Sequence, residues 1–227
     1  MNIPVFSIII PVRNCSSYIG QAIESIQNQQ SSGFEMEIIV VDDGSVDDSG
    51  NIAASLGCTV ITIPASGVVK ARNIGVKAAK GDFILFLDAD DLLNPDALTS
   101  LYQPIEDDQT LQIVLALRKD FISPDMTDDE KKLITLKQEP YSGAIAGCAL
   151  IRRELFDVIG YFDESLRTGE AMDWLLRLQN LGEKIKVKKL DYIAVNRRIH
   201  ENNTGRVNRL IEYSDYATIL KNRLKRN

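Results

Sequence analysis

Three aspartates stand within four residues at the end of the most hydrophobic segment of the chain. Asp88, Asp90 and Asp91 directly follow the apolar run 83–87 in the sequence GDFILFLDADD. The run favours a buried strand, whereas carboxylates resist burial unless their charge is compensated. Helix capping explains Asp91, but Asp88 and Asp90 need a counter-charge, and a hard divalent cation is the simplest one. The pattern therefore indicates Mg²⁺ or Mn²⁺ with open positions for substrate phosphates.

A second pair of acids also follows an apolar run. Asp42 and Asp43 close the run at 36–43 and are followed by glycine and serine. In a parallel α/β sheet, ligands bind beyond the carboxyl ends of the strands. Both acidic motifs are therefore expected at one edge of a sheet.

The first half of the chain alternates strand-like and helix-like segments. The apolar runs without alternation lie at 6–12, 36–43, 58–64 and 82–90. The helix-like segments between them lie at 16–29, 47–57 and 67–81, the last in its second half. Continuous apolar runs are typical of strands buried on both faces, as in a parallel sheet. The order β-α-β-α-β-α-β predicts an α/β, doubly wound, Rossmann-like fold with flanking helices.

The second half of the chain is less regular. The expected helices lie near 94–105, 153–159 and 169–182, with a short one inside the loop 123–133. The expected strands lie at 113–118, before the helix in 143–166, and in 184–200. No linker separates two parts, so a single domain is expected.

Composition excludes several classes of protein. Lys and Arg number 26 against 32 Asp and Glu, a net charge of −6, which argues against general nucleic-acid binding. The three cysteines are widely spaced, which disfavours a disulfide framework and a cysteine zinc site. The chain has no signal-peptide pattern and no apolar stretch of about 18 residues, so we expect a cytoplasmic protein without an integral membrane segment.

Several motifs occur in an order that resembles one enzyme family. They are PVRN (11–14), VVDDGS (40–45), KARNIGVKAAKGDFILFLDADD (70–91) and GYFDESL (160–166). Together they resemble the family 2 glycosyltransferases over about residues 5–200. The resemblance implies a GT-A fold and an inverting, hexosyltransferase-type reaction with a nucleotide-sugar donor, for which we expect a UDP-sugar.

The resemblance also predicts how the domain 1–227 is organised. It implies a nucleotide-binding half at about 1–95, an acceptor and catalytic half at about 96–205, and a C-terminal helical tail at 206–227. The tail ends in KNRLKRN. We expect a solvated helix end there, with peripheral contact to a membrane or a partner as the alternative.

The family's nucleotide-sugar contacts can be carried over by position. The residues expected at the uracil base are Pro11, Arg13 and Asp43. The residues expected to line the nucleotide and sugar pocket are Lys70, Arg72, Asn73, Asp88, Ala89 and Asp90. A basic side chain such as Lys70 or Arg72 in this pocket would meet a doubly charged diphosphate. The alternative for Arg13, Lys70 and Arg72 is a role at the surface, solvated or in a salt bridge.

The resemblance assigns the cation, Mn²⁺ or Mg²⁺, to the D-x-D pair and the single histidine. Asp90 is the expected direct ligand, and Asp88 is expected to bind ribose or sugar hydroxyls or a metal-bound water. His200 matches a histidine that closes over the nucleotide and completes the metal shell in many members. A neutral imidazole suits manganese, and a purely structural histidine is the alternative.

The catalytic base departs from the family pattern. Inverting transfer needs a carboxylate that accepts the proton of the attacking hydroxyl. In the family this carboxylate is usually an Asp that follows a Glu at the start of a helix in the second half. When Arg177 and Gly182 are aligned with that pattern, Glu170 matches the Glu and Ala171 matches the catalytic Asp. Alanine cannot accept a proton. Asp173 is the preferred replacement, because the pair Asp173–Trp174 resembles a bacterial subset of the family. Glu170 is the second choice. The alternative for both residues is a structural role, in which an acid at a helix N-terminus interacts with the helix dipole.

Three other functions compete with this prediction. A sugar nucleotidyltransferase needs a Gly-rich phosphate loop, which PVRNCSSYIG lacks. A Rossmann oxidoreductase needs G-x-G-x-x-G after the first strand, and none is present. A non-catalytic nucleotide-sugar binder is the third, suggested by Ala171. The acceptor stays open among a saccharide, a lipid-linked sugar, a peptide and a small molecule.

Overall fold

The computed structural model describes residues 3–29, 33–137, 139–142, 145, 147–180, 185–201 and 203. The predicted helical tail at 206–227, with its basic end, lies outside these residues. None of the helices within the described ranges is both long and apolar enough to cross a membrane.

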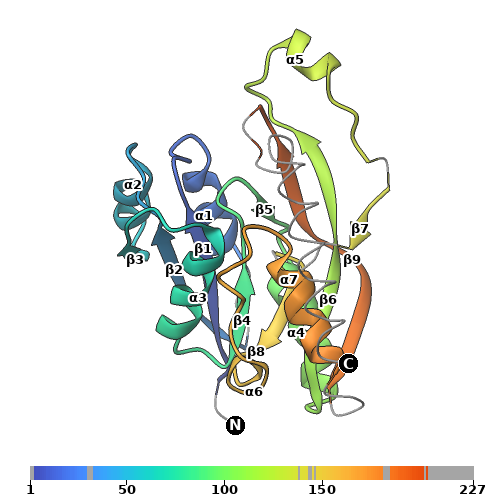
Figure 1. Ribbon diagram of the computed structural model, residues 1–227. Coiled ribbons are helices and arrows are strands. Elements are labelled where there is room, and N and C mark those ends of the chain that lie inside the picture. Colours follow the sequence, from blue (N-terminus) through green and yellow to red (C-terminus); the bar gives the residue numbers. More distant parts are fainter. Residues whose placement is uncertain are drawn as a thin grey trace.

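The first half forms the predicted βαβαβαβ unit (Figure 1). Its strands are β1 (Val5–Val12), β2 (Glu35–Asp42), β3 (Thr59–Thr62) and β4 (Phe83–Phe86). Its helices are α1 (Ile19–Gln27), α2 (Ser49–Ser55) and α3 (Val68–Ala78). β1 pairs in parallel with β2 and β4, and β2 pairs in parallel with β3. The carboxyl ends of these strands therefore meet at one edge of the sheet, as expected.

The strand at 82–90 is shorter than predicted. β4 ends at Phe86, and the backbone N–H of Asp91 donates to the carbonyl of Asp88 at 3.0 Å. The acidic residues thus form a turn. In a continuing strand Asp88 and Asp90 would share one face, whereas the turn lets neighbouring carboxylates point to different partners.

The second half adds strands of both directions to the sheet. Its strands are β5 (Leu92–Leu93), β6 (Leu111–Ile122), β7 (Tyr141–Ser142), β8 (Ala149–Arg152) and β9 (Lys186–Ile199). Its helices are α4 (Ala97–Asp107), α5 (Asp128–Lys132), α6 (Leu155–Ile159) and α7 (Glu170–Gln179). Within the described residues the strand order is β3-β2-β1-β4-β8-β6-β9-β5, with β7 paired to β6. β8 is antiparallel to β4 and β6, whereas β9 runs parallel to β6.

β6 is longer than the strand predicted at 113–118. It pairs with β9 as far as Ile122 and Ile199, and the two strands rise beyond the rest of the sheet (Figure 1). The chain then passes through α5 and returns at β7. We call residues 123–140 the arm.

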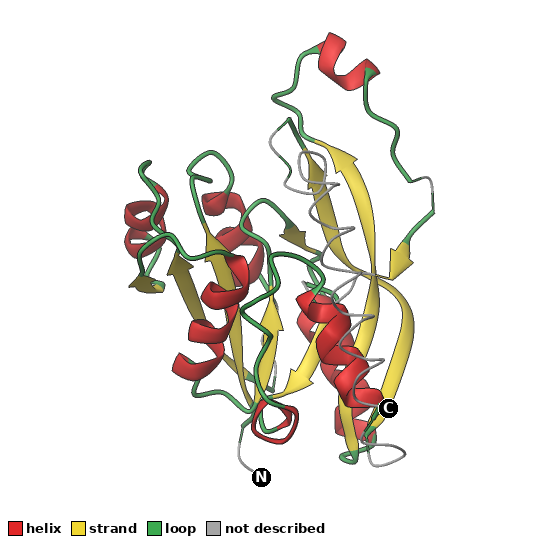
Figure 2. Ribbon diagram, in the orientation of Figure 1, coloured by secondary structure: helices red, strands yellow, loops and turns green. Residues whose placement is uncertain are grey.

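Helices cover both faces of the sheet (Figure 2). Along β1, Ile8 and Ile10 enter the core beneath α1 and α4, while Ile9 enters the core beneath α3 and α7. Alternate residues of a strand point to opposite faces, so both faces of β1 are buried. This explains the continuous apolar runs and confirms the predicted mostly parallel α/β sheet in a single domain.

α3 approaches β1 closely because it carries a glycine at the contact. A Cβ atom on Gly75 would lie 2.3 Å from Cγ2 of the fully buried Ile9. This spacing sets the position of Arg72 and Asn73, which lie on the same helix.

Gly75→Ala is predicted to lower the free energy of unfolding by about 1–3 kcal/mol, because the added methyl overpacks the α3–β1 contact. Gly20→Ala in α1 is the matched control, since its Cβ would meet Ile52 at an ordinary 3.8 Å. The control should be neutral or stabilising by up to about 1 kcal/mol. Chemical denaturation measures both, and equal effects of the two variants would contradict the close-contact argument.

Candidate functional site

Arg72 forms ion pairs with two acids, Asp88 of the acidic turn and Glu170 of the second half. Nη2 of Arg72, on α3, donates to Oδ1 of Asp88 at 2.7 Å, and Nη1 donates to Oε1 of Glu170, the first residue of α7. The side chains of Arg72 and Glu170 are 11 % and 8 % exposed, against 36 % for Asp88. Burial lowers the pKa of Arg72, but Asp88 and Glu170 outweigh it and raise that pKa above its ordinary value. A charged arginine therefore joins the acidic turn to α7.

Asp90 contacts the histidine that was predicted to share its metal. Nε2 of His200 lies 2.9 Å from Oδ2 of Asp90, and Nδ2 of Asn203 donates to the same oxygen at 3.2 Å. The backbone N–H of His200 donates to Oδ1 of Asn203 at 2.6 Å. The imidazole ring also lies 4.8 Å from the ring of Tyr18. The structure thus brings Asp90 and His200 together across 110 positions of sequence.

Asp91 is the buried member of the acidic turn. It is 3 % exposed and accepts the backbone N–H of Arg198 at 2.9 Å. Burial, followed by the charges of Asp90 and Asp88, raises the pKa of Asp91 well above its ordinary value. Burial therefore favours the uncharged form of the Asp91 side chain.

Arg198 fixes this turn to two other parts of the molecule. Its buried guanidinium donates to the carbonyl of Asp90 at 2.9 Å, to Oε1 of Gln21 at 2.7 Å and to Oγ of Ser123 at 3.1 Å. It also lies 4.7 Å from the centre of the Tyr18 ring. These contacts join the turn, α1 and the start of the arm. The sequence offered no signal for this role, because the partners come from distant segments.

The described residues do not form a complete protein cage for a metal. They contain no group of three or more His, Cys, Asp and Glu side chains that could hold one, and Asp88 is paired with Arg72. Asp90 and His200 nevertheless fit a divalent cation. Mg²⁺ needs only one or two carboxylates when substrate phosphates and water complete its shell, and Mn²⁺ accepts oxygen and imidazole ligands.

The residues predicted at the uracil base lie at the ends of β1 and β2. Pro11 is buried in β1, and Arg13 is exposed just beyond that strand. Asp43 is 4 % exposed; its Oδ1 accepts the N–H of Ser66 at 2.6 Å and its Oδ2 accepts the N–H of Gly67 at 2.9 Å. Asp43 therefore anchors the loop before α3, and its contact with a base stays a prediction.

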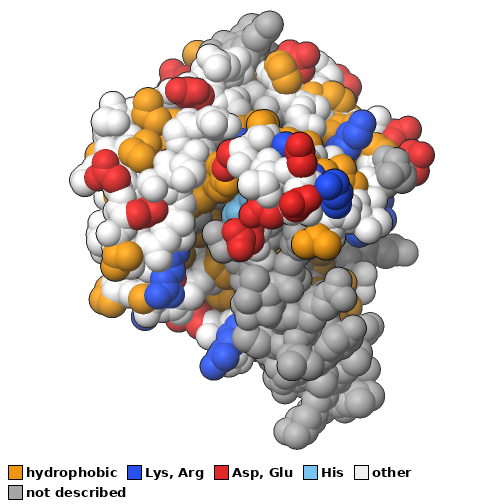
Figure 3. Space-filling view, turned by 90° about the horizontal axis from the view of Figure 1, so that it is seen from above, with side chains coloured by type: hydrophobic (Ala, Val, Ile, Leu, Met, Phe, Trp, Pro, Cys, Tyr) orange, Lys and Arg blue, Asp and Glu red, His pale blue; other side chains and the backbone are white. Residues whose placement is uncertain are grey.

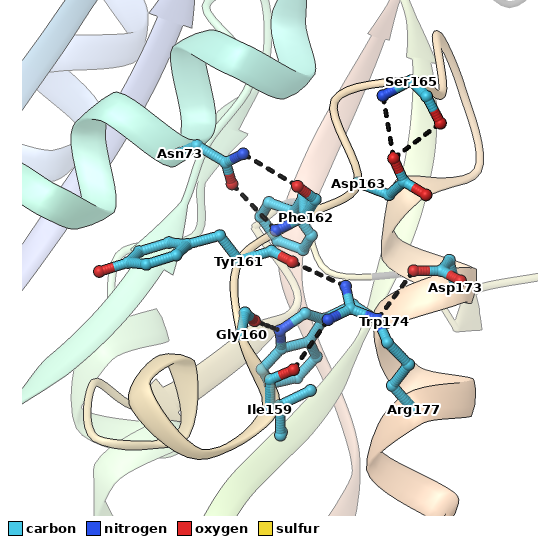
Figure 4. Close-up of polar contacts among 10 residues, drawn as sticks. All are labelled: Asn73, Ile159, Gly160, Tyr161, Phe162, Asp163, Ser165, Asp173, Trp174 and Arg177. Atoms are coloured by element: carbon cyan, nitrogen blue, oxygen red, sulfur yellow. Dashed lines mark hydrogen bonds and ion pairs between the residues drawn. The ribbon is translucent and has the colours of Figure 1, made fainter.

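The other predicted pocket residues differ in their surroundings. Lys70 is exposed on α3 and has no hydrogen bond or ion pair with the described residues, whereas Ala89 is buried in the turn. Asn73 is 1 % exposed; it donates to the carbonyl of Phe162 at 2.9 Å and accepts the N–H of Phe162 at 3.0 Å (Figure 4). It also donates to Oε1 of Glu164 at 3.0 Å. Asn73 thus positions the loop before α7.

Asp173 belongs to a different group of contacts from Glu170. Its Oδ2 accepts from Nε of Arg177 at 2.9 Å, and that arginine also donates to the carbonyls of Ile159 and Tyr161 (Figure 4). Trp174 is fully buried. The Asp173–Arg177 pair therefore fastens α7 to the loop after α6. Seen from above, where α5 of the arm lies nearest the viewer, Asp and Glu side chains gather near the middle of the surface (Figure 3).

Comparison with known proteins identifies the family. The model of Glycosyl transferase family 2 matches residues 7–160. The chain belongs to glycosyl transferase family 2. It is 27 % identical to a chondroitin synthase of Pasteurella multocida (strain Pm70) over 99 % of this chain and 24 % of that protein. It is 32 % identical to the uncharacterized glycosyltransferase EpsJ of Bacillus subtilis (strain 168) over 83 % of this chain and 59 % of that protein.

This family 2 chain also resembles solved structures. S. aureus TarS 1-349 in complex with UDP-GlcNAc aligns over 87 % of this chain and 59 % of that chain, with a TM-score of 0.69 and 24 % identity. TarS 1-349 in complex with UDP aligns with a TM-score of 0.68. The likeness confirms the predicted GT-A fold class. The chain spans less than two thirds of each of these relatives.

Arg72→Met is predicted to lower the free energy of unfolding by about 3–5 kcal/mol, because it leaves the buried Glu170 without a counter-charge. Adding Glu170→Gln should recover more than half of that loss, since the buried charge is then gone. Chemical denaturation measures the cycle. Lys132→Met is the control, because its pair with Asp129 is exposed and worth less than about 1 kcal/mol. If the double variant were no more stable than Arg72→Met, the loss of stability would not come from the unpaired charge of Glu170.

Proposed function

We propose that this family 2 chain is a metal-dependent, inverting glycosyltransferase that moves a sugar from a UDP-sugar to an acceptor hydroxyl. Family membership supports the transferase class, and the complexes of TarS with UDP and UDP-GlcNAc support the choice of donor. The observation that carries the proposal is the Arg72 bridge, which joins Asp88 of the D-x-D turn to Glu170 of α7. The acid proposed to bind the donor and the acid proposed to activate the acceptor therefore share one arginine.

The donor would lie along the carboxyl edge of the parallel strands. Pro11, Arg13 and Asp43 are proposed to bind the uracil end, where parallel α/β sheets bind ligands. Asp88 is proposed to bind ribose or sugar hydroxyls, since it is the most exposed acid of the bridge. Lys70, exposed and unpaired among the described residues, has a charge suited to a phosphate.

Asp90 and His200 are proposed to hold Mn²⁺ or Mg²⁺. A bound divalent cation would supply electrostatic stabilisation of the charge on the departing diphosphate. The chain itself sets the positions of the two ligands: Asn203 fixes the Asp90 carboxylate, and Arg198 fixes the backbone carbonyl of Asp90. The cytoplasmic location expected from the sequence is part of this proposal.

Glu170 is proposed as the catalytic base. The acceptor hydroxyl loses its proton to a carboxylate while its oxygen attacks the anomeric carbon, and the bond from that carbon to the diphosphate breaks. Arg72 places Glu170 beside the donor acids, whereas Asp173 is fastened to Arg177. This geometry reverses the order of preference drawn from the sequence. Ala171, at the family's usual position, is buried beside α7 core residues.

A non-catalytic nucleotide-sugar binder is the second candidate. Ala171 favours it, as does the fact that Glu170 and Asp173 are both ion-paired. Such a binder would retain UDP but release no sugar from any UDP-hexose.

Asp90→Asn is predicted to make UDP affinity independent of manganese, because it removes the charged ligand of the proposed cation. In the unaltered protein, adding Mn²⁺ should strengthen UDP binding at least about tenfold, and EDTA should reverse the effect. Titration calorimetry measures both proteins. Asp129→Asn, which alters an exposed acid of the arm, should behave like the unaltered protein. Persisting manganese dependence in Asp90→Asn would reject the assignment.

Glu170→Gln is predicted to slow sugar transfer about 10²–10⁴-fold while UDP still binds, because proton removal is lost but donor contacts remain. Release of UDP from a panel of UDP-hexoses with saccharide acceptors measures the rate, and thermal unfolding checks the fold. Asp173→Asn is the paired variant and should retain most activity. Slow transfer in Asp173→Asn alone would restore Asp173 as the base.

A further inference from the structure

A second charged group lies on the face of β9 opposite to Arg198. Neighbouring residues of a strand point to opposite faces. Arg198 pairs in register with Phe121 and stacks on its ring at 4.9 Å, whereas Arg197 pairs with Asp120 and places Nη1 3.7 Å from its Oδ1. Arg197 therefore belongs to a group of side chains separate from the partners of the acidic turn.

This group gathers three cations around one tyrosine. The guanidinium of Arg118 lies 4.8 Å from the centre of the Tyr141 ring, and Nζ of Lys137 lies 3.8 Å from it. Nη1 of Arg197 lies 3.4 Å from the Tyr141 hydroxyl, which donates to Oδ1 of Asp120 at 2.6 Å. We call these five residues the Tyr141 cluster. Three cations against one carboxylate leave a formal charge of +2.

The Tyr141 cluster has donors that the protein does not use. Nε of Arg118 is buried without a hydrogen-bond partner, and the Arg118 guanidinium makes no ion pair within the described residues. Lys137 is exposed and contacts the ring. Asp120, 7 % exposed, is already engaged by Tyr141 and Arg197. A buried guanidinium donor with no partner is costly to maintain and suits a carboxylate or phosphate oxygen.

The Tyr141 cluster lies where β6 runs beside β7 and β9. On β9, Arg197 is followed by Arg198, whose backbone N–H donates to Asp91 of the acidic turn at 2.9 Å. Burial lowers the pKa of Arg197, but Tyr141, Asp120 and also Asp91 of the acidic turn raise it above its ordinary value. The cluster is therefore one residue of β9 away from a contact of the acidic turn, and it shares no residue with the proposed donor site.

We propose that the Tyr141 cluster binds a phosphate or carboxylate group of the acceptor, so that the acceptor of this enzyme is anionic. This inference rests on the proposed transferase function. Arg118 and Arg197 supply the planar, charged donors that suit such an oxyanion, and Lys137 adds charge from the arm. The diphosphate of the donor is the other source of the same chemistry, and the experiment separates the two.

The test follows the Nε–Hε signals of the arginines by ¹H–¹⁵N NMR during titration. Glycerol 3-phosphate and methyl glucuronide serve as anionic probes, and glycerol and methyl glucoside as neutral ones. The Arg118 signal, identified by its loss in Arg118→Lys, should move saturably with at least one anionic probe and with neither neutral probe. Lys137→Gln, an exposed change that spares the fold, should weaken that binding about tenfold.

Arg152→Gln is the matched control. Arg152 also stacks on an aromatic ring, that of Phe83 at 5.0 Å, but its Nε donates to the carbonyl of Leu111 at 2.9 Å. Removing it should leave the affinity for the anionic probes unchanged. Equal weakening by Arg152→Gln and Lys137→Gln would overturn the proposal, because it would show a general charge effect.

Two further outcomes would overturn the inference. An Arg118 signal that no probe moves would remove the site, and a signal moved only by UDP would assign the cluster to the donor diphosphate. A parallel titration with UDP and Mn²⁺ distinguishes failure of the anionic-acceptor proposal from failure of the proposed transferase function. Binding of UDP without a response at Arg118 refutes only the anionic acceptor, whereas absence of UDP binding refutes the transferase proposal itself.

Discussion

The structure depends on how it accommodates three carboxylates within four residues after a buried strand. A continuous strand would leave Asp88 and Asp90 side by side, and their repulsion would oppose folding. The turn after β4 instead directs them to separate partners: Arg72 for Asp88, His200 for Asp90, and the backbone N–H of Arg198 for Asp91. These partners come from α3 and from the end of β9 and the residue after it, so pairing the acids with them also assembles the site.

The same contacts connect the two halves of the molecule. Arg72 reaches Glu170 on α7, 98 positions along the chain, and Arg198 ties the turn to α1 and to the start of the arm. Gly75 permits the close packing of α3 on β1, and this packing positions Arg72 of α3 so that it contacts Asp88 of the turn. The acidic turn and α7 are thus positioned by two arginines, each buried among partners from distant segments. Such an arrangement would keep the side chains proposed to react in place before a substrate binds.

Much of this arrangement could be predicted from the sequence because it is local. Continuous apolar runs specify strands buried on both faces, and their alternation with helices specifies a parallel α/β sheet. The position of the acids after a strand places them at the ligand-binding edge. The long-range contacts had no such signal. The pocket role predicted for Asn73 stays a prediction, and the structure adds its contact with the loop at Phe162, which the sequence did not indicate. The contact of Glu170 with Arg72 and that of Asp173 with Arg177 were likewise not visible in the sequence.

A crystal soaked with Mn²⁺ and UDP would locate the cation by its anomalous diffraction. We expect a manganese peak bonded to the Asp90 carboxylate and Nε2 of His200, with the UDP diphosphate completing its shell and Asp88 still paired with Arg72. UDP bound elsewhere, or a peak bonded to neither Asp90 nor His200, would show that the acidic turn is not a cation-bridged donor site.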